Sequence, residues 1–233
     1  QDNLAKIRLI FDNLAWFWSN NRNKMMMDKD NINNKNNDLN NSLIQKLTAI
    51  QTKQVGKIRK IPPLQSWQPR RTTPLDIEIR DNGEWWHEGQ KMTRQSLVDL
   101  FASVLWVEWH DDQAIHYLKT PTDKYQIHVA DAPLFINQVT QVTDADGEWI
   151  KFGTTNGDVI RLDEDHPLYF KRFGDEERVY IDTRFGLTAR LMNNAMYHLI
   201  QMGRLSQIQE NGQNKTVLKL SSGGKIYQIE QHG

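Results

Sequence analysis

Dipeptides that form tight turns, placed between short runs of strand-forming residues, constrain the fold of this chain most. Asn82-Gly83 separates residues 76–80 from residues 84–88. An Asn-Gly pair supplies the two positive φ angles that a tight hairpin turn needs. The same dipeptide recurs at Asn156-Gly157. Turns of this kind predict antiparallel hairpins, so we expect a protein built largely on sheets.

A helix is expected directly after the first hairpin. Thr93 can cap it through its hydroxyl, and apolar residues recur at three- and four-residue spacing from Leu97 to Leu105. This apolar stripe must be buried against a sheet. Residues 115–119 and 124–130 predict a second hairpin, which completes a small sheet with one helix laid on it.

A short motif occurs in two of the expected hairpins. Residues 83–89 (GEWWHEG) and 147–153 (GEWIKFG) share the pattern G-E-W-x-x-x-G, and each follows a turn. Its occurrence at the same point of two hairpins indicates an internal duplication. We therefore expect the two hairpins to superpose, with Trp85 and Trp149 in equivalent places.

The second half is predicted to be an antiparallel sheet closed by a helix. Its strands are expected in five runs: 134–142, 148–153, 158–162, 167–172 and 177–182. The helix is expected from about Leu187 to Met202, with Gly203 ending it. This order is typical of a pleckstrin-homology-like barrel with a terminal helix. Residues 206–233 add a polar spacer and a last hairpin.

The N-terminal segment, residues 1–60, is interpreted as an extension that is partly disordered. Residues 4–18 predict a short amphipathic helix, and half of the residues from 28 to 41 are Asn. The helix is either an interfacial membrane element or a peripheral or non-native extension. Residues 53–75 are basic and rich in proline, and they form either a solvated arm or a phosphate contact.

Charge and cysteine content exclude several classes of function. Lys plus Arg and Asp plus Glu both number 29, so no overall field attracts nucleic acid or an anionic membrane. The chain has no cysteine, which excludes disulfides, thiolate zinc sites and a cysteine nucleophile. We expect a cytoplasmic protein without a membrane span, and we consider nucleic acid an unlikely partner.

Motifs for catalysis or metal binding are weak. His110-Asp111-Asp112 and His116 offer possible ligands, but zinc needs three or four converging groups. The chain has no nucleophile elbow, P-loop, H-E-x-x-H or dinucleotide-binding glycine motif. No catalytic residue, metal or cofactor is therefore assigned.

Five segments in order resemble the bacterial family called domain of unknown function 1285: PPLQSW, DIEIRDNGEWWHEG, RQSLVDLFASVL, YLKTPTDKYQIHVADAPL and GLTARLMNNAMYHL. The resemblance covers about residues 61–204. It implies a duplicated core, a pleckstrin-homology-like second half, and a nucleotide-like ligand bound between the halves in signalling. It carries no established activity. Thr122-Asp123 departs from the expected aliphatic-Glu pair, and the final hairpin is expected to lie outside the resemblance.

We therefore predict an α+β protein with two related sheet-plus-helix halves. Its expected parts are 1–60, an extension; 61–135, an N-terminal α+β domain; 136–205, a pleckstrin-homology-like domain; and 206–233, a tail with a hairpin. The function that fits is a non-enzymatic, cytoplasmic sensor of a small, nucleotide-like ligand in signal transduction. The alternative is a hydrolase or transferase acting on a nucleotide.

The ligand is expected at the N-terminal ends of the two helices and the seam between the halves. Arg94 and Arg190 would each lie in a first helical turn, where the helix dipole disfavours a cation unless an anion is bound. Arg184 and Lys124 would add donors, and Trp86 would stack on a base. The alternative is that each arginine pairs with a nearby carboxylate.

Overall fold

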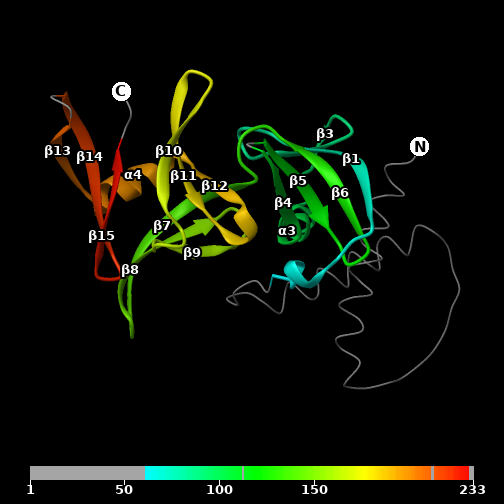
Figure 1. Ribbon diagram of the computed structural model, residues 1–233, viewed down its shortest axis with the longest axis horizontal. Coiled ribbons are helices and arrows are strands. Elements are labelled where there is room, and N and C mark those ends of the chain that lie inside the picture. Colours follow the sequence, from blue (N-terminus) through cyan, green and yellow to red (C-terminus); the bar gives the residue numbers. More distant parts are fainter. Residues whose placement is uncertain (1–60, 112, 211–212, 231–233) are drawn as a thin grey trace, which may run out of the picture.

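Two mixed six-stranded sheets, each with one helix, and a three-stranded antiparallel sheet form the described part of the protein (Figure 1). The structure is a computed structural model, and it describes residues 61–111, 113–210 and 213–230. The predictions made for residues 1–60 lie outside the described residues. The protein is mostly β, with fewer helical residues than the α+β expectation implies. Within the described ranges, no helix is long and apolar enough to span a bilayer.

The first half forms a sheet with the strand order β3-β2-β1-β6-β5-β4. β1 pairs in parallel with β6, and the other pairs are antiparallel. Helix α3 packs on one face, where Phe101 lies against the ring of Trp85. The elements are η1 (Leu64–Ser66), β1 (Arg71–Ile79), β2 (Trp85–His87), β3 (Gln90–Lys91), α3 (Gln95–Ser103), β4 (Leu105–His110), β5 (Gln113–Lys119) and β6 (Asp123–Val129).

The second half forms a sheet with the strand order β10-β11-β12-β7-β8-β9. β12 pairs in parallel with β7, and the other pairs are antiparallel. Helix α4 lies against β7. The elements are β7 (Leu134–Asp144), β8 (Gly147–Thr154), β9 (Val159–Arg161), β10 (Leu168–Phe173), β11 (Glu176–Asp182), η2 (Arg184–Gly186), β12 (Thr188–Leu191) and α4 (Asn193–Met202).

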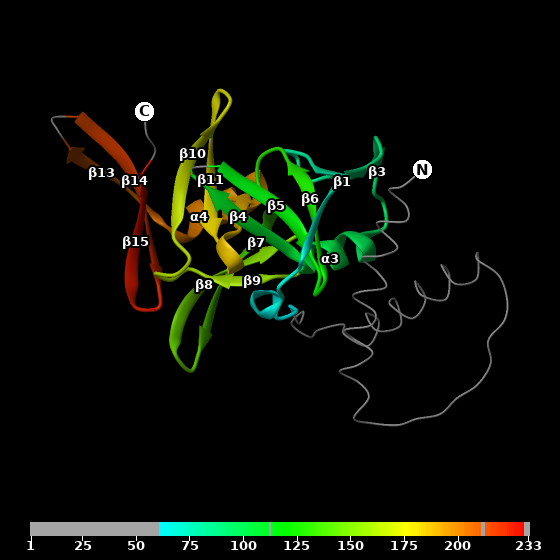
Figure 2. The ribbon, with the colours of Figure 1, turned by 45° about the vertical axis from the view of Figure 1, so that its right-hand side comes forward.

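Both halves have the same strand topology. Each consists of two three-stranded meanders joined by a parallel pair between the first and the last strand of the half. The helix differs in position, because α3 connects the two meanders of the first half and α4 follows the last strand of the second. The strand order thus agrees with the predicted repeat. Figure 2 shows the two sheets lying next to each other.

The tryptophans of the repeated motif do not occupy equivalent places. β2 and β8 are both the second strand of their half, as predicted. Trp85, however, is 4% exposed and faces α3, whereas Trp149 alternates along β8 with the buried Ile150 and Phe152 and lies on the opposite face. The prediction of equivalent tryptophans is wrong, because the turn before β8 is shorter and shifts the register of the motif by one residue.

The second half is an open sheet and not a closed barrel. The predicted antiparallel barrel is wrong because β12 joins β7 in parallel at the centre of the sheet. This pairing leaves β9 and β10 as the two edges. In the described part of this half, β9 and β10 do not pair with each other, so the sheet is not closed.

Both predicted helices begin later than expected. Strand β12 precedes α4, and strand β4 follows α3. Residues 188–191 form β12, with Ala189 and Leu191 buried at a spacing of two, so α4 begins only at Asn193. The prediction that Arg190 lies in the first turn of a helix is therefore wrong. In the first half the N-cap residue is Arg94 instead of Thr93, without a side-chain cap bond, and β4 replaces the predicted end of the helix.

The C-terminal residues form a third sheet of β13 (Arg204–Glu210), β14 (Gln213–Ser222) and β15 (Lys225–Glu230). The predicted last hairpin is confirmed as β14 and β15, whereas the predicted polar spacer is strand β13. The turn of the hairpin docks on the second half. The Oγ of the fully buried Ser222 accepts a hydrogen bond from the Ile150 N–H (3.0 Å) and donates one to the Leu162 carbonyl (2.8 Å).

The halves contact each other through β4 and η2. The rings of Trp106 and Phe185 pack with centroids 5.5 Å apart. Arg184 donates to the carbonyl of Ala102 at the end of α3 (2.7 Å) and pairs with Asp158 (3.0 Å). The seam therefore has an aromatic contact and a largely buried arginine that ties the second half to the first helix.

Replacement of Ser222 by alanine should destabilise the protein by about 2 kcal/mol, because a buried N–H and a buried carbonyl would each lose their partner. Ser221→Ala is the matched control, because Ser221 is the adjacent, exposed serine. Urea unfolding followed by circular dichroism measures the difference. Equal midpoints for the two variants would contradict the proposed role of Ser222.

His116 should make stability depend on pH. It pairs with the buried Val107 and Ile127, and burial, together with the charge of His128, lowers its pKa to about 4. The unfolded chain takes up the proton near the ordinary pKa of 6.5, so stability is fully present above that pH and falls as the pH drops towards 4. The loss is about 3 kcal/mol at most.

The measurement is urea unfolding at pH 7.0 and pH 4.5. His116→Gln should lose less stability between these pH values than the wild type. His198→Gln, at an exposed position on α4, should keep the wild-type dependence. If all three proteins lost the same amount, His116 would not be the source of the pH dependence.

Candidate functional site

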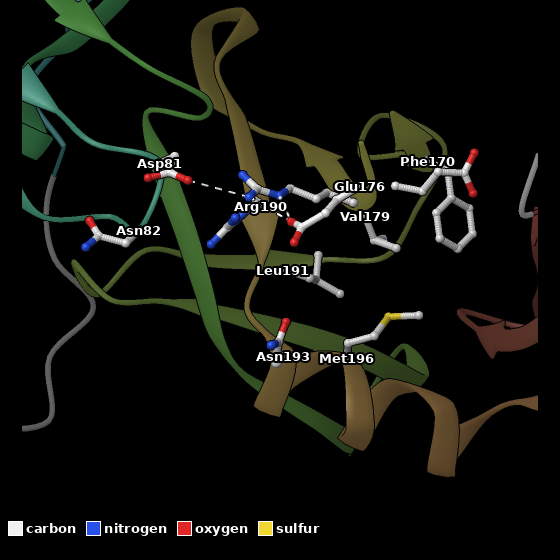
Figure 3. A pocket seen from close by; sticks show the side chains of 11 residues that line it. Asp81, Asn82, Phe170, Glu176, Val179, Arg190, Leu191, Asn193 and Met196 are labelled. Carbon is white, nitrogen blue, oxygen red and sulfur yellow. Dashed lines mark hydrogen bonds and ion pairs between the residues drawn. The ribbon is translucent and has the colours of Figure 1, made fainter. Parts of the chain in front are cut away.

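A cavity of about 610 Å³ lies at the seam between the two halves (Figure 3). The β1–β2 turn forms one side, and strands β10 to β12 with the start of α4 form the other. The turn lies close to β7, because a Cβ on Gly83 would be 3.0 Å from the ring of Phe135. The lining residues are Asp81, Asn82, Phe170, Glu176, Glu177, Arg178, Val179, Arg190, Leu191, Asn193 and Met196.

A buried carboxylate holds the cationic side of this cavity in place. Asp131 lies in the short connection between β6 and β7, and its side chain is 2% exposed. It accepts hydrogen bonds from the Tyr180 hydroxyl (2.5 Å) and from Nη1 of Arg178 (2.8 Å). Nη1 of Arg190 forms an ion pair with it at 3.5 Å. Burial and the bond to Asp131 raise the pKa of Tyr180, so the phenol keeps its proton.

Arg178 connects Asp131 to the rim of the cavity. Its Nη2 lies 2.9 Å from a carboxylate oxygen of Glu176 and 3.5 Å from one of Asp81, which belongs to the first half. Burial alone lowers the pKa of Arg178, but its bonds to Asp131 and Glu176 outweigh burial and raise it. Asp81 and Glu176 are 50% and 69% exposed, so solvent screens both of these ion pairs.

Arg190 is the less satisfied of the two arginines. It lies directly opposite Tyr180 on the neighbouring strand, and its guanidinium is 5.1 Å from the ring of Phe135. Its Nε is buried without a hydrogen-bond partner. Burial and the charge of Arg178 lower the pKa of Arg190, although Asp131 acts in the opposite direction. An added anion would stabilise this guanidinium.

The remaining wall is partly apolar and partly acidic. Phe170, Leu191 and Met196 provide an apolar surface, and Asn82 and Asn193 provide amides. The acidic residues on the wall are Asp81, Glu176 and Glu177. An arrangement of this kind suits a molecule with one anionic group, an apolar or flat part, and hydrogen-bond donors.

The structure separates the five residues predicted to bind a ligand. Arg190 lines the cavity, whereas the other four lie elsewhere. Arg184 is at the seam, but it is engaged by Asp158 and the Ala102 carbonyl. Arg94 is exposed at the N-cap of α3.

Lys124 and Trp86 are also engaged by neighbours within the first half. Lys124 pairs with Glu108. Arg80 lies 3.5 Å from the centroid of the Trp86 ring, and the Trp86 indole donates to Glu84. The two residues therefore fill places in side-chain clusters of the first sheet and do not reach the cavity.

Sequence reasoning missed Asp131, Arg178 and Tyr180. Arg178 and Tyr180 are two residues apart on a strand, so they share a face, and this spacing was the available signal. Asp131 is distant from both in sequence, and it comes near them because β12 pairs with β7 on one side and with β11 on the other. As for metals, the described residues contain no group of three or more His, Cys, Asp and Glu that could hold an ion.

Comparison with known proteins gives two adjacent family matches. The model described as domain of unknown function (DUF1285), N-terminal domain, matches residues 62–132. The model described as protein of unknown function (DUF1285), C-terminal domain, matches residues 133–229. The chain belongs to the DUF1285 family. The prediction that the final hairpin lies outside the resemblance is wrong, because the second match includes it.

Two solved structures are similar to this DUF1285 protein. A DUF1285 family protein from Silicibacter pomeroyi DSS-3 is 26% identical, with a TM-score of 0.62 over 78% of this chain and 94% of that chain. A DUF1285 family protein from Shewanella baltica OS155 is 24% identical, with a TM-score of 0.42 over 54% of this chain and 91% of that chain. The comparison with curated proteins finds no match.

Asp131→Asn should destabilise this DUF1285 protein by about 3 kcal/mol, because it leaves two largely buried guanidinium groups without their shared counter-charge. Asp81→Asn removes one of the two exposed carboxylate partners of Arg178 and should cost less than about 1 kcal/mol. Thermal and urea unfolding of both variants measures the difference. If Asp131→Asn were as stable as Asp81→Asn, Asp131 would not organise the arginines.

Proposed function

We propose that this protein is a non-enzymatic, cytoplasmic ligand-binding protein that senses a small, nucleotide-like molecule in bacterial signal transduction. The ligand occupies the cavity at the seam. The observation that carries this proposal is the pair of arginines on the wall of a cavity between two repeated halves. The cavity volume is in the range that small-molecule sites commonly have.

The position of the cavity supports a sensing role. Asp81 and Asn82 come from the first half, and Arg178 and Arg190 come from the second. A ligand that contacts both sides stabilises one arrangement of the halves over others, and this differential binding is what a sensor requires. A downstream partner would then recognise the stabilised arrangement.

The wall chemistry supports a ligand with separate anionic and ring parts. A phosphate would lie at Arg190 and Arg178, where it replaces the exposed carboxylate of Glu176. A base would pack on Phe170 and Met196, and its amino groups would donate to Asn82 or to the acidic rim. The acidic rim favours a ligand of low total charge over one with several phosphates.

Calorimetric titration of the full chain with a panel of mononucleotides and cyclic nucleotides tests the proposal. Arg190→Gln should weaken binding on the order of tenfold, because a charge-assisted hydrogen bond is lost. Arg94→Gln is the control, because Arg94 is exposed and outside the cavity, and it should bind like the wild type.

Chromatography of the incubated nucleotides separates sensing from catalysis. Recovery of unchanged nucleotide together with measurable binding supports the sensor. Turnover that disappears in Arg190→Gln would support a hydrolase or transferase instead. Equal affinity of the wild type and Arg190→Gln, with melting temperatures showing both folded, would exclude the cavity as the binding site.

A further inference from the structure

We propose that the face of the first sheet directed away from α3 carries a second site, which binds an oxyanion through Lys119 and Lys124. The site is separate from the seam cavity, because neither lysine lines that cavity. Lys119 is the last residue of β5, and Lys124 is the second residue of β6. The anion is a phosphate or carboxylate group.

The register of the sheet places the two lysines side by side. Lys119 and Lys124 are directly opposite each other in the antiparallel pair β5–β6, so both side chains leave the same face. Tyr117 and Trp106 form the neighbouring pair on this face. Like charges directly opposite each other are unfavourable in a sheet unless something compensates for them.

The protein compensates for only one of the two charges. Lys124 lies 2.5 and 2.7 Å from the two carboxylate oxygens of Glu108, with its ammonium over the ring of Tyr117 at 4.6 Å. Glu108 therefore neutralises Lys124. Its charge also reaches Lys119, but the carboxylate does not come within ion-pair distance of that ammonium.

Lys119 has no hydrogen-bond acceptor among the described residues. The residue is 6% exposed, and its Nζ lies 3.7 Å from the centroid of the Trp106 ring. In the described part of the chain, no carboxylate pairs with it and no oxygen accepts a hydrogen bond from it. Burial lowers the pKa of Lys119, and the charge of Lys124 acts in the same direction, while Glu108 opposes both.

An oxyanion meets the need that this arrangement leaves open. An ammonium donates up to three hydrogen bonds, and the indole face of Trp106 supplies charge density but no hydrogen-bond acceptor. An oxyanion between the two lysines would accept from Lys119 and replace part of the contact between Lys124 and Glu108. The cluster has two cations and one carboxylate, so one bound negative charge balances it.

The test is a titration of the full chain with inorganic phosphate at constant ionic strength, followed by the backbone amide shifts of residues 117–125 in NMR spectra. Lys119→Gln should weaken phosphate binding on the order of tenfold. Lys91→Gln is the matched control, because Lys91 also pairs with a carboxylate, Glu84, on the same sheet, and it should leave binding unchanged.

Glu108→Gln distinguishes a site from a merely structural lysine. Removal of this carboxylate leaves two cations without a partner, so phosphate should bind more tightly, by on the order of fivefold to tenfold. A lysine that serves only to pack on Trp106 would give no such gain. If Lys119→Gln does not fold, Lys124→Gln replaces it in the comparison with Glu108→Gln. Lys124→Gln should also weaken phosphate binding.

Equal phosphate affinity in the wild type, Glu108→Gln and whichever lysine variant folds would overturn the proposal. A second arm replaces phosphate with sedimented vesicles of an anionic phospholipid, with vesicles of a zwitterionic phospholipid as the control. Binding of phosphate without binding of vesicles assigns the oxyanion to a soluble ligand. Vesicle binding that the lysine variant abolishes assigns it to a lipid headgroup.

Discussion

The parallel pairing of the first and last strands within each half determines most of the arrangement. Because β1 pairs with β6 and β7 pairs with β12, both ends of each half lie at the centre of its sheet. The short connection from β6 to β7 therefore joins the centres of the two sheets. Asp131 lies in this connection, and the arginines that it holds come from β11 and β12, on one side of β7.

The local part of this fold follows from the sequence, and the long-range part does not. Asn82-Gly83 and Asn156-Gly157 mark turns because the backbone conformation they need is set by those residues alone. Residues 188–191 have apolar positions that fit a strand and a helix equally well, and only the partner strand β7 decides between them. The same holds for the site. The sequence predicted Arg190 as a binding residue, but for a wrong reason, because the helix expected to contain it begins only at Asn193. Asp131 could not be predicted, because its contacts depend on how the strands pair.

The two proposed sites show two ways in which a β protein keeps cations inside its structure. At the seam, one buried carboxylate forms ion pairs with two guanidinium groups, and exposed carboxylates at the rim add further negative charge. On the first sheet, Lys124 forms an ion pair with Glu108, and the ammonium of Lys119 lies over the ring of Trp106. Arginine and lysine differ in this respect, because a guanidinium can share one acid between several N–H groups, while an ammonium acts as a compact point charge.

The connection between β9 and β10 limits how flat the second sheet can be. Backbone hydrogen bonds extend the two edges to Leu162 and Pro167, so four residues, 163–166, cross from one edge to the other. A fully extended chain over that interval reaches about 18 Å. Six flat strands would hold their edges about 24 Å apart. The first half, where α3 makes the crossing, is free of this tether. The second sheet must therefore curve until its two edges are no more than about 18 Å apart. It is curved like part of a cylinder, but its edge strands do not hydrogen-bond to each other.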